Sequence, residues 1–231
     1  MAYRNGPKII TDGLVLCLDA AIGKSYPGSG NTWYDVSGNG YNGTLENGPT
    51  FDSNNAGGID FDSTDDYVQL SEVSGFQTNK FTIEMFLKTE QALDSSQFFA
   101  FFSTITSLNA GFQLFWRGSS YQYFYLFVGD IVVTSDSGSI PTGTFLHLAA
   151  TYDAGNVNNV ALYVNKTRYG GTGLGTYATS NLPPRILGRR ADSNSDYHLD
   201  CKLYTTRFYN RVLSANEVQQ NYKATKGRFG L

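Results

Sequence analysis

The sequence predicts an all-β fold: a two-sheet antiparallel jelly-roll sandwich that ends in one short C-terminal helix. Short runs rich in aromatic and β-branched residues recur along the 231 residues, and many of the 25 glycines fall between them. Aromatic residues make up 15% of the chain and charged residues only 16%, a balance that suits many strands joined by tight turns. The length suits one sandwich, so we expect residues 1–12 to form an N-terminal arm and residues 13–231 a single domain.

The first expected strand covers residues 14–19, where leucines occupy every second position. Tight turns follow at 38–43, because glycine and asparagine adopt positive φ at little cost. Two short strands are then expected at 58–61 and 67–70, on either side of an acidic turn.

The run at 81–88 is the clearest strand, since hydrophobic and polar side chains alternate along it. Phe86 alone breaks the alternation. We expect Phe81, Ile83, Met85 and Leu87 to face the core, and Thr82, Glu84 and Lys88 to face solvent.

The same signals continue through the second half of the chain. Strands are expected at 98–102, 111–116, 122–128, 131–134, 146–152, 160–164, 166–169, 185–187 and 202–209. Gly129 and Asp130 predict a two-residue hairpin turn between two of these strands.

One helix is expected, at residues 215–222. Ser214 and Glu217 have the spacing of a capping box, and Leu213 and Val218 have that of a hydrophobic staple.

Composition excludes several classes of function. A net charge of −3 gives no basic surface for nucleic acid. The sequence contains no apolar run of about 20 residues, so we expect no membrane-spanning segment. The start of the chain lacks the apolar region of a signal peptide, so we expect synthesis in a cytoplasm. Cys17 and Cys201 are therefore expected to be reduced, buried thiols. No cofactor is required for stability, since a chain of this length buries roughly 70% of its unfolded surface.

Several motifs resemble one family. The runs WYDVSGNGYNGTL at 33–45 and FDSTDDYV at 61–68 are similar to the laminin-G-like branch of concanavalin A-like lectin/glucanase domains. The similarity continues in LHLAATYD at 146–153, LYVN at 162–165 and YNRVLSANEV at 209–218, and it covers most of the chain. The segments GLVLCLDA at 13–20 and KGRFGL at 226–231 most resemble versions found in bacteriophage virion proteins.

This resemblance implies a concanavalin A-like sandwich, a fold that hosts lectins, adhesins, decoration proteins and hydrolases. We interpret the chain as a non-enzymatic binding module on a phage virion, made in the host cytoplasm, that attaches to host-surface carbohydrate. One alternative is a structural capsid decoration or assembly protein that packs on capsid or tail subunits. Another is a glycoside hydrolase. A homo-oligomer is compatible with the binding and structural roles.

The candidate ligand-binding residues are Trp116, Arg117, Tyr121 and Tyr123, because sugar rings present apolar C–H faces to aromatic side chains. Every second residue from Tyr121 to Phe127 is aromatic, so these side chains share one face of a strand. The residues between them are apolar too. One face is therefore expected in the core, and the other beneath a partner layer or at a binding or oligomer surface. Trp116, Arg117 and Tyr121 are expected at the exposed loop end.

Asp65 and Asp66 are the candidate metal ligands, together with Asp60 and Asp62. Carboxylate oxygens suit Ca²⁺, and the resemblance implies calcium on this face because many relatives carry it. Aspartates in turns also accept backbone hydrogen bonds without any metal. In addition, the segment CKLYT at 201–205 lacks two carboxylates that relatives often carry there.

No catalytic residue is expected. Related glucanases carry an E-x-D-x-E strand, which this sequence lacks, and glycoside hydrolysis needs two carboxylates flanking the sugar bond. Glu84 is expected on the solvent face of its strand, and the resemblance places His147 in a core strand. Arg189 and Arg190 either contact an anionic glycan or partner, or lie in a solvated loop, which is the interpretation that the sequence favours.

Overall fold

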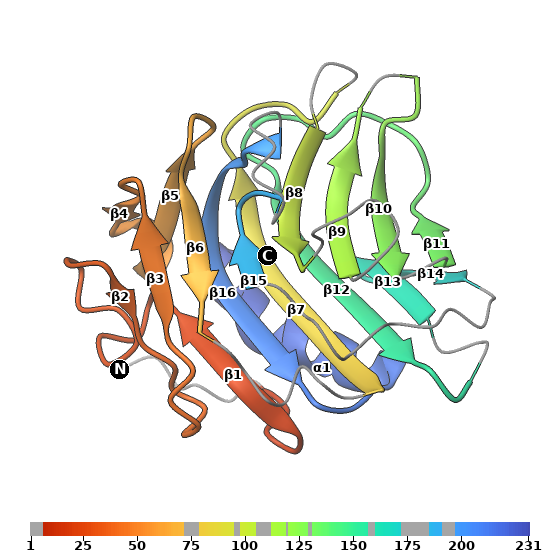
Figure 1. Cartoon of the computed structure of the whole chain (residues 1–231), viewed down its shortest axis with the longest axis horizontal. Helices are drawn as coiled ribbons and strands as arrows, with labels where there is room; N and C mark the ends of the chain where they lie inside the picture. Colours follow the sequence, from red (N-terminus) through yellow and green to blue (C-terminus); the bar gives the residue numbers. More distant parts are fainter. Residues whose placement is uncertain are drawn as a thin grey trace.

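Two antiparallel sheets pack face to face, and one helix near the C-terminus lies behind them (Figure 1). This arrangement, seen in a computed structural model, confirms the predicted sandwich. The structure describes residues 7–71, 79–94, 98–104, 112–118, 120–128, 131–156, 160–171, 185–190 and 197–231.

The first sheet has β7 and β16 at its centre. Its order is β14 (Thr167–Gly171), β13 (Val160–Val164), β12 (Phe145–Asp153), β7 (Lys80–Thr89), β16 (Asp200–Tyr209), β5 (Gly58–Asp62) and β4 (Thr50–Asp52), and β1 (Leu14–Asp19) also pairs with β16.

The second sheet lies in front in Figure 1. Its order is β11 (Ile131–Thr134), β10 (Tyr123–Val128), β9 (Phe112–Arg117), β8 (Phe98–Ser103), β15 (Arg185–Leu187), β6 (Tyr67–Leu70), β3 (Gly43–Glu46) and β2 (Thr32–Trp33). The short strands β2, β3 and β4 were not predicted, because turn residues dominate the segment that holds them.

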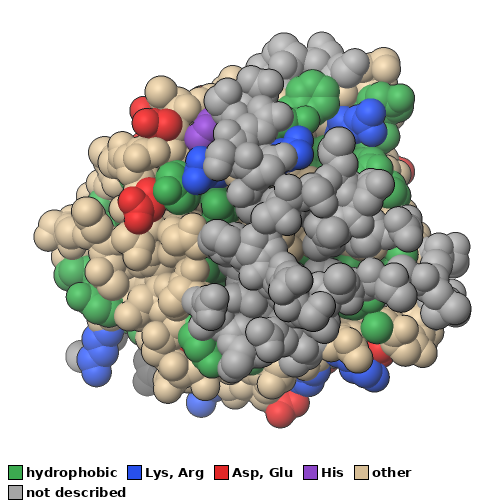
Figure 2. All heavy atoms as spheres, in the orientation of Figure 1, with side chains coloured by type: hydrophobic (Ala, Val, Ile, Leu, Met, Phe, Trp, Pro, Cys, Tyr) green, Lys and Arg blue, Asp and Glu red, His purple; other side chains and the backbone are tan. Residues whose placement is uncertain are grey.

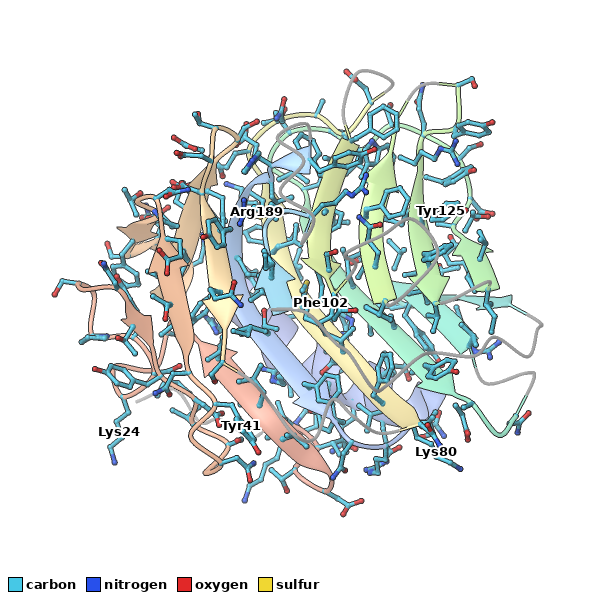
Figure 3. The ribbon with its side chains drawn as sticks, in the orientation of Figure 1. Lys24, Tyr41, Lys80, Phe102, Tyr125 and Arg189 are labelled. Carbon is cyan, nitrogen blue, oxygen red and sulfur yellow. The ribbon has the colours of Figure 1, made fainter. Side chains whose placement is uncertain are left out.

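The main core fills the space between the sheets. Phe81, Ile83, Met85 and Leu87 of β7 are buried there, as the alternation predicted. Phe102 of β8, labelled in Figure 3, is buried in the same cluster.

The outer face of the first sheet was predicted to contact solvent, and that prediction is wrong. Thr82 and Glu84 are buried on this face because helix α1 (Ala215–Lys226) covers it. Thr82 Oγ1 donates a hydrogen bond to the Arg211 carbonyl and accepts one from the Leu213 backbone N–H. Phe86, the residue that broke the alternation, faces the same covered side.

The last residues of the chain complete this cover. The ring of Phe229, in the 3₁₀ turn η4 (Gly227–Phe229), stacks on Phe86 at 4.5 Å between centroids. Arg228 Nη1 donates to Asp19 Oδ1 at 2.7 Å, and its Nη2 donates to the Gly57 carbonyl. A second 3₁₀ turn, η1 (Asn54–Ala56), lies between β4 and β5.

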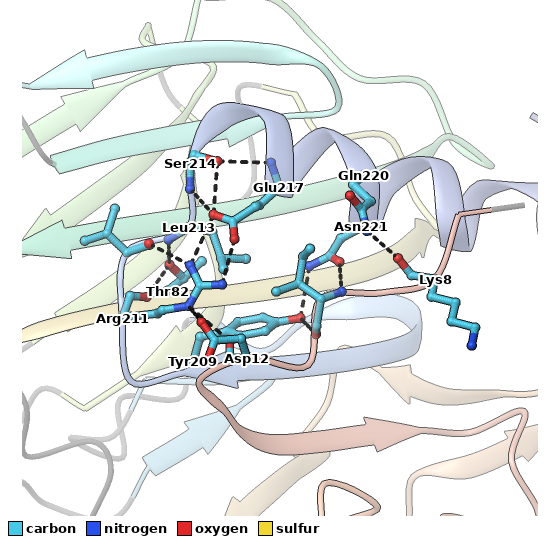
Figure 4. Close-up of polar contacts among 12 residues, drawn as sticks. Lys8, Asp12, Thr82, Tyr209, Arg211, Leu213, Ser214, Glu217, Gln220 and Asn221 are labelled. Atoms are coloured by element: carbon cyan, nitrogen blue, oxygen red, sulfur yellow. Dashed lines mark hydrogen bonds and ion pairs between the residues drawn. The ribbon is translucent and has the colours of Figure 1, made fainter.

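Helix α1 begins at the predicted capping box and runs to Lys226, four residues beyond the predicted end. Figure 4 shows its start, where Ser214 Oγ accepts from the Glu217 backbone N–H and the Glu217 carboxylate accepts from the Ser214 backbone N–H. Arg211 pairs with the Glu217 carboxylate at 2.6 Å. This pairing holds the pKa of Glu217 at about 2, so the cap is charged at neutral pH.

The N-terminal residues that the structure describes dock on the same helix. The Ile10 backbone N–H donates to Asn221 Oδ1 at 2.7 Å, and Gln220 Nε2 donates to the Lys8 carbonyl (Figure 4).

Replacing Ser214 with alanine is expected to cost about 1 kcal/mol of stability, because it removes the side-chain acceptor at the helix start. Ser53 precedes η1 but makes no side-chain cap hydrogen bond, so Ser53→Ala is the matched control. It should change the free energy of unfolding by only a few tenths of the loss expected for Ser214→Ala. Chemical denaturation measures both. Equal unfolding midpoints for the two variants would show that Ser214 contributes nothing as a cap.

Cys17 and Cys201 are both free and buried, and burial raises the pKa of both thiols. Strands β1 and β16 are neighbours, but Cys17 lies opposite Arg207 in their register.

In the part of the chain that the structure describes, no helix has the length and hydrophobicity to cross a membrane. The predicted turn at Gly129 and Asp130 lies outside the described residues, although Val128 pairs with Ile131 as a two-residue hairpin requires.

Candidate functional site

Strands β9 and β10 present one face to the core and the other to the outside. Their register places the outward residues Gln113, Phe115 and Arg117 opposite Phe127, Tyr125 and Tyr123. Phe124 and Leu126 are buried on the inner face, as predicted. The expected aromatic face is therefore present, and cross-strand pairing widens it: the rings of Phe115 and Tyr125 lie 4.7 Å apart.

Trp116 does not belong to this face. Only 1% of it is exposed, and its ring packs edge-on against Phe124 at 5.1 Å. Its Nε1 donates to the Asp94 carbonyl at 3.0 Å. The predicted position at an exposed rim is wrong because Trp116 has the same strand parity as the buried Leu114, and the opposite parity to Arg117.

The other three predicted binding residues lie together. The Arg117 guanidinium is 4.2 Å from the centre of the Tyr121 ring and 5.7 Å from that of Tyr125. The Tyr123 ring lies between those of Tyr121 and Tyr125, at 5.5 and 6.0 Å. Tyr121 is 43% exposed, so this end of the aromatic face contacts solvent.

A pocket of about 290 Å³ opens beside these residues. It is lined by Phe98, Gln113, Phe115, Arg117, Tyr125, Phe127, Arg190 and Tyr197. Figure 3 labels Tyr125 on β10, and Figure 2 shows basic and hydrophobic side chains side by side over this part of the second sheet.

Arg190 was assigned to a solvated loop, and the structure corrects this. The residue is buried, and its guanidinium lies 4.6 Å from the centre of the Tyr197 ring. Asp192 and Asp196, which the sequence places nearby, lie outside the described residues. No pattern within β9 or β10 could have identified Arg190 or Tyr197, because both come from a distant part of the sequence.

Burial raises the pKa of the Tyr125 hydroxyl, and the positive charge of Arg117 only partly opposes this. Tyr125 is therefore a neutral phenol at physiological pH, able to donate or accept a hydrogen bond. The pocket thus combines aromatic surfaces with hydrogen-bond donors and two positive charges.

A second candidate site is the acidic turn between β5 and β6. Carboxylate oxygens of Asp62, Asp65 and Asp66 lie within 4.8 Å of one another. Asp66 is buried and also accepts a hydrogen bond from the Asp62 backbone N–H at 3.1 Å. The turn therefore joins Asp65 and Asp66, as expected for hard-cation ligands, while also showing the backbone bonding expected without a metal.

Asp60 is not in this group. Lys202 Nζ lies 3.7 Å from Asp60 Oδ2, 2.7 Å from Asp52 Oδ2 and 3.6 Å from Glu90 Oε2. A lysine thus supplies the positive charge at Asp60 that the sequence-based hypothesis assigned to calcium.

Burial, with the negative charges of Asp62, Asp65 and Asp60, raises the pKa of Asp66 from 3.8 to about 6. The folded state then binds this proton more tightly than the unfolded state, so stability falls as pH rises from about 4 to about 6. Asp66→Asn should therefore match the parent near pH 4 and be more stable near pH 7, as measured by thermal unfolding with chelator present. Asp136→Asn is the control at an exposed carboxylate.

Calcium tests the same turn separately. A site of micromolar affinity would add about 4 kcal/mol at millimolar Ca²⁺, and Asp66→Asn would remove most of that gain. An unfolding midpoint that ignores both Ca²⁺ and chelator would exclude Asp65 and Asp66 as ligands.

Glu84 and His147 meet on the covered face of the first sheet, on the opposite side of the sandwich from the pocket. His147 Nε2 and Glu84 Oε1 are hydrogen-bonded at 2.8 Å, and Asn221 Nδ2 donates to Glu84 Oε2 at 2.8 Å. Arg207 Nη1 lies 3.7 Å from the same carboxylate. All four side chains are buried, so they join the sheet to α1 rather than face a substrate.

Comparison with known proteins agrees with this architecture. The family model described as "Concanavalin A-like lectin/glucanases superfamily" matches residues 62–219. No curated protein sequence matches the chain.

Two solved structures illustrate the similarity of fold. A mutant of Trypanosoma rangeli sialidase that displays trans-sialidase activity matches with a TM-score of 0.68 and 15% identity, over 96% of this chain and 35% of its own. The binding domain of botulinum neurotoxin DC in complex with SialylT matches with a TM-score of 0.68 and 11% identity, over 94% of this chain and 52% of its own. The chain thus spans between about a third and a half of these structures.

Proposed function

The chain belongs to the concanavalin A-like lectin/glucanases superfamily, and on that premise we propose that it is a non-enzymatic carbohydrate-binding module. The pocket over β8, β9 and β10 is the observation that carries this proposal. Its rings present flat apolar surfaces on which the C–H face of a sugar can stack. Tyr125 and Arg117 supply polar groups that hydrogen-bond sugar oxygens.

The composition of the pocket supports a binding role over a hydrolytic one. Among the described residues that line it there is no aspartate or glutamate, whereas most glycoside hydrolases use a pair of such carboxylates. Glu84 is buried on the opposite side of the sandwich, beneath α1. Assaying any bound glycan for turnover tests this part of the proposal, and detectable hydrolysis would overturn it.

The proposed setting is the surface of a phage virion, where the module attaches to host-surface carbohydrate. The resemblance of segments 13–20 and 226–231 to bacteriophage virion proteins supports this setting. The competing role is a decoration or assembly protein. The exposed ring of Tyr121 favours this second role, because exposed aromatic side chains are also enriched at protein–protein interfaces.

A glycan array, followed by titration of the best ligand, separates the two roles. Tyr121→Ala and Tyr125→Ala should each weaken binding several-fold, because an aromatic contact contributes about 0.5–1.5 kcal/mol beyond the area that it buries. Tyr34→Ala is the matched control, since Tyr34 is similarly exposed but adjoins β2 at the other edge of the second sheet. A silent array, with the same variants shifting the oligomeric or particle-bound fraction, would establish the structural role instead.

A further inference from the structure

The pocket carries positive charge, which the binding of a neutral sugar does not explain. Of the described residues that line the pocket, two are arginines and none is acidic, although the chain as a whole has a net charge of −3. Guanidinium groups bind carboxylates through two parallel N–H···O bonds, a geometry that a neutral hydroxyl does not match.

Arg117 lies over aromatic rings and not beside a carboxylate of the described residues. Among the described residues it forms no ion pair with a carboxylate, while its guanidinium lies against the rings of Tyr121 and Tyr125. A guanidinium carries five N–H donors and no acceptor, so without a carboxylate partner Arg117 has donors that a ligand oxygen can accept from.

Gln113 adds a neutral donor in the wall of the same pocket. The residue is only 7% exposed, and within the described part of the chain its Nε2 has no hydrogen-bond partner. A buried amide without a partner lowers stability, so its presence in a pocket wall is accounted for when a ligand oxygen accepts from it.

From these three observations we propose that the pocket binds the carboxylate of an acidic sugar, with Arg117 and Arg190 opposing its charge and Gln113 donating a hydrogen bond. The rings of Phe115 and Tyr125 then contact the apolar face of that sugar. This inference rests on the proposed carbohydrate-binding function and names its ligand class, glycans that contain a sialic or uronic acid.

Calorimetric titration of the full chain with matched pairs of oligosaccharides tests it. One pair is sialyllactose and lactose, and a second is a uronic-acid oligosaccharide and its carboxyl-reduced form. The acidic member of a pair should bind roughly tenfold or more tightly than the neutral one. Its Kd should also rise between about 0.05 M and about 0.5 M salt, because salt screens the attraction. A sulfated oligosaccharide is titrated as well. If it binds and the carboxylated oligosaccharides do not, the pocket recognises sulfate, and the carboxylate assignment is overturned.

Variants locate the effect. Arg117→Gln should remove the preference for the acidic member, and Arg117→Lys should restore only part of it because a lysine lacks the planar fork. Gln113→Leu should weaken binding while leaving thermal stability equal or higher, since it replaces an unsatisfied buried amide with an apolar side chain. A purely structural role for Gln113 cannot produce that combination. Arg168→Gln, at an exposed arginine on β14, is the control and should change neither quantity.

The outcomes separate this inference from the function on which it rests. Equal binding of acidic and neutral glycans would overturn the carboxylate assignment and leave carbohydrate binding intact. An unchanged preference in both Arg117→Gln and Gln113→Leu would also overturn it. Binding of no glycan at all would overturn the proposed function together with the inference.

Discussion

Replacing Glu84 with alanine is expected to destabilise the protein by about 3–5 kcal/mol, the range for breaking a buried charged pair from one side. The change removes the acceptor for Asn221 and the hydrogen-bonded partner of His147. It also leaves the buried Arg207 guanidinium without the carboxylate that lies 3.7 Å from it. Denaturant unfolding measures the loss.

Two further variants show whether charge or shape is responsible. Glu84→Gln keeps the size of the side chain but removes its charge, so an intermediate loss is expected. Glu46→Ala, at a half-exposed position on β3, is the control and should change stability by no more than about 0.5 kcal/mol. If the free energy of unfolding of Glu84→Ala differs from that of the parent by no more than the control does, the buried network does not stabilise the fold.

Trp116→Ala is expected to cost about 3–5 kcal/mol, as large-to-small substitutions of buried aromatic residues do. It would open a cavity against Phe124 and leave the Asp94 carbonyl without the donor at 3.0 Å. Trp116→Phe retains most of the packing, so its cost should be near the roughly 1 kcal/mol of one hydrogen bond.

Tyr121→Ala is the matched comparison on the outer face. Because its ring is 43% exposed, its removal should change the free energy of unfolding by about 0.5 kcal/mol or less. The two variants together separate the core face of this hairpin from its outer face. Similar losses for both would contradict the assignment of Trp116 to the core and Tyr121 to the surface.

The sequence identified the strands wherever a local period of two was strong. The alternation in β7 correctly placed Phe81 and Met85 in the core. It could not show what covers the other side, because helix α1 arrives from the far end of the chain. Thr82 and Glu84 looked solvent-exposed for that reason, and only Phe86 indicated a covered face.

The candidate site was also predicted only where local strand periodicity determined it. Tyr121, Tyr123 and Arg117 lie together because their positions follow from one hairpin and its parity. Trp116 was grouped with them by closeness in sequence, although its parity in β9 directs it inward. Arg190 and Tyr197 join the pocket only through tertiary structure, which a local pattern does not encode.

Both described ends of the chain lie on the helix side of the sandwich. The Lys8 carbonyl is bonded to Gln220, and Phe229 packs on Phe86, whereas the pocket opens on the outer face of the other sheet. A tether at either end would therefore point the pocket away from its support. Copies arrayed on one scaffold would all present their pockets in the same direction, and a glycan-coated surface would then be held by many weak contacts at high effective concentration. Orientation of this kind would give the proposed carbohydrate-binding module avidity beyond the affinity of one pocket.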